Sequence, residues 1–223
     1  MYLSLVMLIY VYLLVTAILF YGMALKGKVK YITILFCYLT IDLVVSILSV
    51  LLIDLSIVRN NLFLFHLFTP IEYSLLTYLY IQVISSSVLK KVLWASIPFF
   101  ILLSVIFSQF IQGLKINNSY MSIIESVLLI CWTLFFMREI LLLKQVTVLY
   151  KYPLFWISVG ILVYFTESLV IEGLLAYMVS HSPELARKVY RLGFIFSYLF
   201  LLSLIVGAFC QIVTAKQKET QVN

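Results

Sequence analysis

Five carboxylic acids in this sequence lie inside long apolar stretches, where an ionisable side chain is unfavourable. They are Asp42, Glu72, Glu125, Glu167 and Glu172. An acid at the centre of a membrane-spanning helix costs about 2.5–3.5 kcal/mol on insertion scales, so it needs a partner or a function. Carboxyl groups at such depths bind cationic groups or carry protons. These acids are therefore the first candidates for a functional site.

Hydroxyl and aromatic side chains accompany the acids at helical spacing. Tyr38, Asp42 and Ser46 recur every four residues, which places them on one helix face. Tyr164 lies about one turn before Glu167. The pattern predicts an intramembrane cavity lined by acids, hydroxyls and tyrosines, and open to the outside.

The stretch HLFTPIEY, which starts at His66, holds the densest set of candidate residues. Pro70 has no amide N–H, so the carbonyl of His66 loses its usual intrahelical donor. Thr69 and Glu72 share a face on adjoining turns. A free carbonyl, a hydroxyl and a carboxyl together are the elements of a binding site at a broken helix. We expect Glu72 to be the central ligand- or proton-binding residue, with His66, Thr69 and Tyr73 beside it.

A purely structural role remains open for each of these residues. A protonated acid can hydrogen-bond a neighbouring helix, which stabilises a bundle by about 0.6 kcal/mol. His66 lies near a span end, where it can reach interfacial water. Arg138 is expected to extend to the headgroups on the inner side. Five buried acids of purely structural role would nevertheless be unusual.

Known catalytic and cofactor motifs are absent from the sequence. There is no H-E-x-x-H, no G-x-S-x-G, and no lysine in the last apolar stretch for a retinal Schiff base. Two histidines are too few for a histidine-rich zinc site. Cys37, Cys131 and Cys210 are expected to be reduced packing residues. We expect no cofactor and no metal, and an intramembrane enzyme is disfavoured.

The composition identifies the elements that must position the acids. Of 223 residues 65% are hydrophobic and 11% charged, with a mean hydropathy of +1.16, whereas soluble domains average about a quarter charged. A membrane-spanning helix needs roughly 20 apolar residues. The sequence predicts an all-α, polytopic transmembrane bundle in one domain (1–214), followed by a short cytoplasmic tail (215–223). Seven helices are expected at 2–24, 31–53, 62–86, 92–112, 121–143, 154–179 and 190–214.

Lysine and arginine predict the orientation of the bundle. Ten lie in or beside the connections that share a side with the C-terminus, and five lie on the other side. The positive-inside rule then places the N-terminus outside and the C-terminus in the cytoplasm. The first stretch lacks a basic n-region and a cleavage site, which favours an uncleaved anchor. The plasma (inner) membrane of a bacterium is the expected location, and nucleic-acid binding is not expected.

Two pairs of stretches align at nearly equal shifts. Residues 38–42 align with 164–167, and 71–76 with 196–201, at shifts of 126 and 125 residues. A parallel repeat of three plus one plus three helices would produce this pattern. The size, orientation and repeat resemble the architecture of small PQ-loop and sugar-exporter transporters, although no proline here is followed by glutamine.

A second resemblance covers most of the chain. The stretches HLFTPIEY, from His66, and FWISVGILVYF, from Phe155, resemble a family of small, uncharacterised seven-helix bacterial membrane proteins. The resemblance implies the seven-helix topology expected above, and its two stretches contain several of the candidate site residues. It implies no activity.

These observations favour a small-solute or proton/cation-coupled transporter. Glu72, Asp42 and Glu167 would bind a cationic group or cycle protons, and the nine residues after 214 are too few for an effector domain. The alternative is a ligand-sensing signalling subunit that acts through a partner protein. The expected partners are the lipid bilayer, an unknown small ligand or ion, and a second copy or a partner membrane protein.

Overall fold

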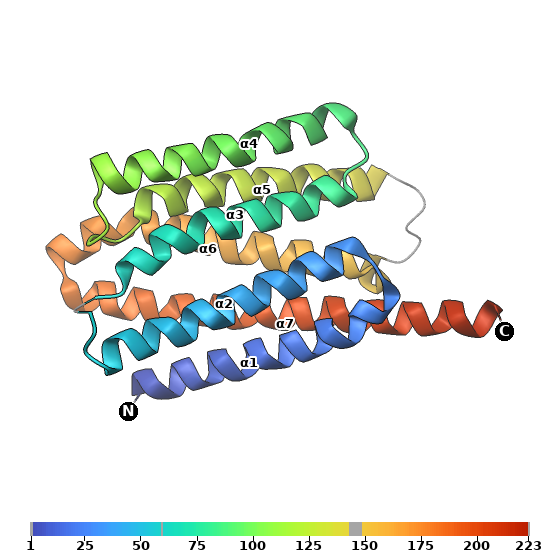
Figure 1. Ribbon diagram of the computed structural model, residues 1–223, viewed down its shortest axis with the longest axis horizontal. Coiled ribbons are helices and arrows are strands. Elements are labelled where there is room, and N and C mark those ends of the chain that lie inside the picture. Colours follow the sequence, from blue (N-terminus) through green and yellow to red (C-terminus); the bar gives the residue numbers. More distant parts are fainter. Residues whose placement is uncertain (1, 59, 143–148, 223) are drawn as a thin grey trace.

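The computed structural model describes residues 2–58, 60–142 and 149–222, and these parts of the chain contain helices and short connections but no strand (Figure 1). Seven helices are long and apolar enough to cross a membrane, which confirms the predicted all-α bundle and indicates an integral membrane protein. The long helices are α1 (Tyr2–Ala24), α2 (Lys30–Asp54), α3 (Leu62–Val83), α4 (Ser87–Ile106), α5 (Ser119–Leu142), α6 (Pro153–His181) and α7 (Pro183–Val222). Single turns are η1 (Leu25–Gly27), η2 (Phe107–Ile111) and η3 (Leu149–Lys151).

Two helices extend beyond the bounds predicted from apolar runs. α4 begins five residues before the predicted 92, because the Ser86 hydroxyl caps it by accepting the N–H of Leu89 at 3.4 Å. α7 begins at Pro183, since proline suits the first turn of a helix. It continues to Val222, so the predicted tail 215–223 is helical as far as 222. Polar residues extend these helices without changing the number of spans.

Six helices form a closed ring, and α4 lies outside it. α1 packs against α2 and α7, α3 against α2 and α5, and α6 against α5 and α7 (Figure 1). The contact between α1 and α7 closes the ring, while α4 packs on the outer side of α3. The interior of the bundle is therefore bounded by six helices from both halves of the chain.

The contact between α6 and α7 depends on small residues. A Cβ added at Gly160 would overlap the hydroxyl of Ser203, and one at Gly207 would lie 2.9 Å from Cγ1 of Ile157. Ser203 and Gly207 are four residues apart, the small-xxx-small spacing that lets membrane helices approach closely. This close contact joins α6 and α7 beside the cavity, whose lining residue nearest to it on α6 is Tyr164.

The outward faces of the helices carry large apolar side chains. Leu8 is 65% exposed and Phe110 82% exposed, a surface that suits lipid and not water. Cys37 and Cys131 are free thiols exposed on these faces, and Cys210 is free and partly exposed. The prediction that the three cysteines are packing residues is therefore wrong for Cys37 and Cys131. In a lipid-facing helix both sides are apolar, so the sequence does not show which side a cysteine occupies.

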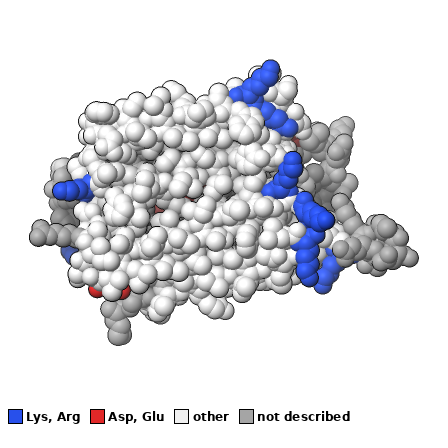
Figure 2. Space-filling view, viewed as in Figure 1, with Lys and Arg blue, Asp and Glu red and all other residues white. Residues whose placement is uncertain are grey.

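Charged side chains are concentrated at the two ends of the bundle. Figure 2 shows Lys and Arg mainly at the end from which the C-terminus projects, with a broad uncharged band between the ends. The connections from α1 to α2 and from α3 to α4 lie at that end (Figure 1). The uncharged band matches the part of the molecule that hydrocarbon would surround.

Candidate functional site

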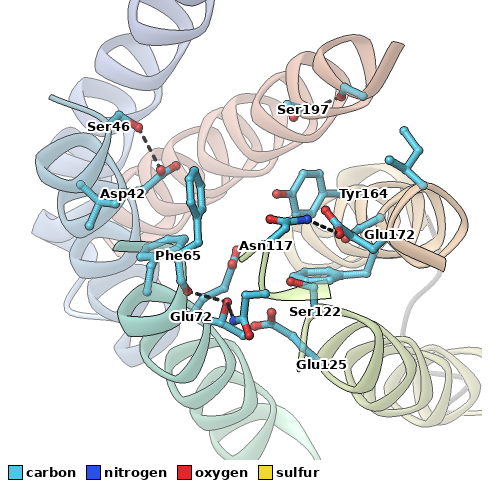
Figure 3. A pocket seen from close by; sticks show the side chains of 18 of the residues that line it. Asp42, Ser46, Phe65, Glu72, Asn117, Ser122, Glu125, Tyr164, Glu172 and Ser197 are labelled. Carbon is cyan, nitrogen blue, oxygen red and sulfur yellow. Dashed lines mark hydrogen bonds between the residues drawn. The ribbon is translucent and has the colours of Figure 1, made fainter. Parts of the chain in front are cut away.

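A cavity of about 460 Å³ lies inside the helix ring (Figure 3). On α1 it is lined by Met7 and Tyr10, so it lies toward the end of the bundle that holds the N-terminus. All six ring helices and the connection before α5 contribute to its wall. Five of the nine acidic residues of the chain line it, and none of its described lining residues is Lys, Arg or His. The cavity is therefore an acidic site within an apolar bundle. The five acids are Asp42, Glu72, Glu125, Glu167 and Glu172.

Two of the acids are each held by a tyrosine from the preceding helix. Tyr10 on α1 donates to Oδ2 of Asp42 at 2.6 Å, and Tyr38 on α2 donates to Oε1 of Glu72 at 2.8 Å. Ser46 also donates to Oδ1 of Asp42 at 3.4 Å. Hydrogen bonds to a carboxylate are stronger than those between neutral groups. These bonds fix both carboxyls at the cavity wall and leave other oxygen sites available for a ligand.

Glu172 on α6 joins the connection that precedes α5. Its Oε2 accepts from Asn117 Nδ2 at 2.8 Å and from Ser119 Oγ at 2.7 Å. Ser119 is the first residue of α5, so the carboxylate lies near a helix N-terminus, which favours negative charge. Glu167, about one turn earlier, lies against α7: a Cβ added at Gly193 would be 2.9 Å from its Oε1.

Glu125 and Asn118 have buried oxygen atoms without hydrogen-bond partners. Their side chains are 3% and 2% exposed, and both residues line the cavity. Within the described residues, no donor reaches Oε1 of Glu125 or Oδ1 of Asn118. The amide nitrogen of Asn118 donates to the Thr69 hydroxyl at 3.0 Å, and that hydroxyl donates to the carbonyl of Phe65 at 2.9 Å. The amide is therefore fixed in place while its oxygen remains unsatisfied.

His66 does not line the cavity, contrary to its predicted place beside Glu72. Its Nδ1 lies 2.9 Å from the hydroxyl of Ser108, in the π-helical turn η2, and its Nε2 lies 2.9 Å from the carbonyl oxygen of Ile116. Because a carbonyl can only accept, Nε2 donates to Ile116 and Nδ1 accepts from Ser108. Six residues separate His66 from Glu72, or about 240° around a helix axis, so the two side chains point to different sides of α3.

We expect His66→Ala to lower stability, because this side chain joins α3 to η2 and to the connection before α5 and does not line the cavity. The substitution removes one buried and one partly buried hydrogen bond and leaves the Ile116 carbonyl without this donor, a loss of about 1–3 kcal/mol. Thermal unfolding of the purified protein in detergent measures it, and Ser108→Ala, which removes one bond, should show a smaller loss. Unchanged stability of the alanine variant would contradict this structural role of His66.

Tyr73 also lies outside the cavity. Its hydroxyl donates to the Ser96 hydroxyl at 2.8 Å, and its ring stacks on Phe100 with centroids 4.0 Å apart. Both partners belong to α4, so Tyr73 attaches α4 to α3. The other predicted site residues, Thr69 and Tyr164 together with the five acids, all line the cavity.

The sequence pattern gives no cavity role to Tyr10, Asn117 or Asn118. The asparagine pair does carry a signal, because it stands directly before an apolar stretch, on the same predicted side of the membrane as the acids. Tyr10 carries none, since it is one of 16 tyrosines in the chain. Its role is visible only in the structure, where α1 packs against α2 and brings the Tyr10 hydroxyl to Asp42.

Comparison of the chain with protein families, with curated proteins and with solved structures finds no match. The resemblance to small seven-helix bacterial membrane proteins is neither strengthened nor weakened. A functional assignment therefore rests on the geometry and charge of the cavity.

Proposed function

We propose that this protein is a transporter for a small cationic solute, coupled to protons or to another cation. The observation that supports this function is a cavity inside the bundle with five carboxyl groups and no described basic side chain in its wall. Charges removed from water must be compensated by an opposite charge or a proton. A cation entering the cavity, or protons taken up in its absence, would supply that compensation.

The architecture is compatible with a repeat of three plus one plus three helices. α4, the linker in such a repeat, lies outside the ring formed by the other six helices. Glu72 and Ser197 occupy equivalent positions at the shift of 125 residues, and both line the cavity. Alternating access in repeat transporters commonly moves one repeat against the other around a site between them. This arrangement supports transport.

Uptake by reconstituted vesicles tests the proposal. The purified protein is placed in vesicles that hold a pH-sensitive dye, and sodium, choline or 1,4-diaminobutane is added outside. We expect at least one of these cations to cause proton movement that protein-free vesicles do not show. A response to none of them, in vesicles shown to contain folded protein, would contradict coupled cation transport.

We propose an N-out, C-in orientation in a bacterial inner membrane, supported by the concentration of Lys and Arg at the end from which the C-terminus projects (Figure 2). In intact cells, Lys115→Cys should react with a membrane-impermeant thiol reagent, whereas Lys91→Cys should react only after permeabilisation. Both positions are exposed and lie in or near connections at opposite ends of the bundle. The reverse labelling pattern would invert the orientation and place the cavity on the cytoplasmic side.

A signalling role has one specific observation in its favour. α7 contributes Gly193 and Ser197 to the cavity and continues as one helix to Val222, past the ends of the neighbouring helices (Figure 1). A ligand that shifts α7 in the cavity would move its projecting end, where a partner protein could respond. Ligand binding without uptake would favour this second function.

A further inference from the structure

Two unsatisfied acceptors in the cavity wall indicate which groups a ligand would have to supply. Oε1 of Glu125 and Oδ1 of Asn118 are buried oxygen atoms without a donor among the described residues. An unsatisfied buried acceptor is destabilising, because the group has lost its hydrogen bonds to water and gained none in the protein. Both residues belong to the cavity wall. A ligand that fits here must therefore present N–H or O–H donors to two places.

The two acceptors lie on one side of α5 and two turns apart. The carbonyl of Asn118 accepts the N–H of Ser122, so Asn118 begins the helical spacing that continues to Glu125. Seven residues correspond to about 20° of net rotation and about 10 Å of rise. One ammonium group reaches acceptors only about 3 Å away. A ligand with two donor groups joined by a short chain therefore matches the distance between the two acceptors better than a ligand with a single donor group.

Carboxyl groups of other helices line the same cavity as the two acceptors. Glu125 and Glu72 are electrostatic neighbours, and both project from adjoining helices into the cavity (Figure 3). At the other acceptor, Glu172 is bonded to Asn117, the residue next to Asn118. Both ends of the pair therefore carry negative charge for a cationic donor. Within the described residues, no three His, Cys, Asp or Glu side chains are grouped to hold a metal ion.

The wall of the cavity also contains aromatic side chains. Phe65, Phe68, Tyr164 and Phe165 line the cavity together with the acids. Such rings cover methylene groups favourably and attract a nearby ammonium through their faces. A cavity of about 460 Å³ has room for a short carbon chain between two charged ends.

We infer that the cavity binds a linear diamine, with one primary ammonium at Glu125 and Glu72 and the other at Asn118 and Glu172. The inference rests on the proposed function in one respect: the diamine bound in the cavity is taken to be the cation that is transported. A primary ammonium supplies three N–H donors and a positive charge, which suit an acidic site with unsatisfied acceptors. A quaternary ammonium supplies the charge without donors, and a diol supplies donors without the charge.

Four ligands of equal chain length test each part of the inference on the purified full-length protein. Calorimetric titration compares 1,4-diaminobutane with 1-aminobutane, 1,4-bis(trimethylammonio)butane and 1,4-butanediol. We expect the diamine to bind at least about ten-fold more tightly than the monoamine and than the quaternary analogue, since each charged hydrogen bond is worth about 1.5–3 kcal/mol. The diol should not bind. Equal affinity for the monoamine, the quaternary analogue or the diol would overturn the inference, as would no binding of the diamine.

Two cavity variants and a matched control locate the bound diamine. Glu125→Gln preserves the side-chain volume and should weaken diamine binding at least about ten-fold. Asn118→Ala removes the outer acceptor and should bring the affinity for the diamine close to that for the monoamine. Glu184→Gln removes an exposed carboxyl at the start of α7, outside the cavity, and should bind normally. Unchanged diamine affinity in both cavity variants would contradict the assigned position. If a variant fails to fold, the four-ligand comparison on the wild type still decides.

Uptake of radiolabelled 1,4-diaminobutane by vesicles separates this inference from the proposed function. Binding without uptake would contradict transport and leave the diamine site in place. Proton movement driven by another cation, without diamine binding, would keep the transporter and overturn the diamine site.

Discussion

Glu72→Gln is expected to abolish cation-coupled proton movement in reconstituted vesicles while leaving the fold intact. Glutamine retains the size of the side chain and an oxygen that accepts from the Tyr38 hydroxyl, now 2.8 Å from Glu72. It removes the charge and the exchangeable proton, next to Asp42 and Glu125 in the same cavity wall. Loss of one charged contact of about 1.5–3 kcal/mol weakens cation binding at least about ten-fold. Loss of the exchangeable proton removes the coupling itself, so no proton movement is expected.

Two further variants make this result specific. Glu72→Leu also removes the acceptor for Tyr38, so it should lower thermal stability by about 1–3 kcal/mol in addition to abolishing uptake. Glu184→Gln lies outside the cavity and should behave like the wild type in both assays. If Glu72 only linked helices, the glutamine variant would transport normally and only the leucine variant would be impaired, through its stability.

Gly160→Ala is expected to lower stability although it adds only one methyl group. The new methyl group would overlap the hydroxyl of Ser203 and lie 3.0 Å from its Cβ and 3.2 Å from Cδ2 of Phe200. One of these contacts is to the part of Ser203 nearest its backbone, so a change of rotamer cannot relieve it. α6 and α7 would have to separate, at a cost of about 1–3 kcal/mol. Thermal unfolding in detergent measures the change.

Gly173 provides the matched control on the same helix. A Cβ added there meets nothing within 4 Å, so Gly173→Ala should be neutral or slightly stabilising, because alanine favours helix. Ser203→Gly combined with Gly160→Ala should recover most of the lost stability, since it removes the two nearest atoms. Equal stability of the Gly160 and Gly173 variants would show that α6 and α7 are not in such close contact.

The sequence by itself determines the number of spans and the acids within them. Both follow from local properties: the length of an apolar run against the thickness of a bilayer, and the cost of a charge within that run. It also identifies Glu72, Thr69 and Tyr164 as cavity residues, because they lie at helical spacing from other polar groups. The predicted bounds of α4 and α7 were too short, because polar residues continue each helix beyond its apolar run.

Only the tertiary structure decides which side of each helix faces the cavity. In a soluble protein the polar face of a helix marks the side that meets water. A helix in lipid is apolar on both sides, so this signal is missing for most positions. The sequence therefore could not show that His66 and Tyr73 face away from the cavity while Glu72 faces into it. Their hydrogen-bond partners show this: Ser108 bonds His66 and Ser96 bonds Tyr73, whereas Tyr38 bonds Glu72. The ring closure of α1 on α7 and the exclusion of α4 depend on contacts between distant segments, which local spacing does not encode.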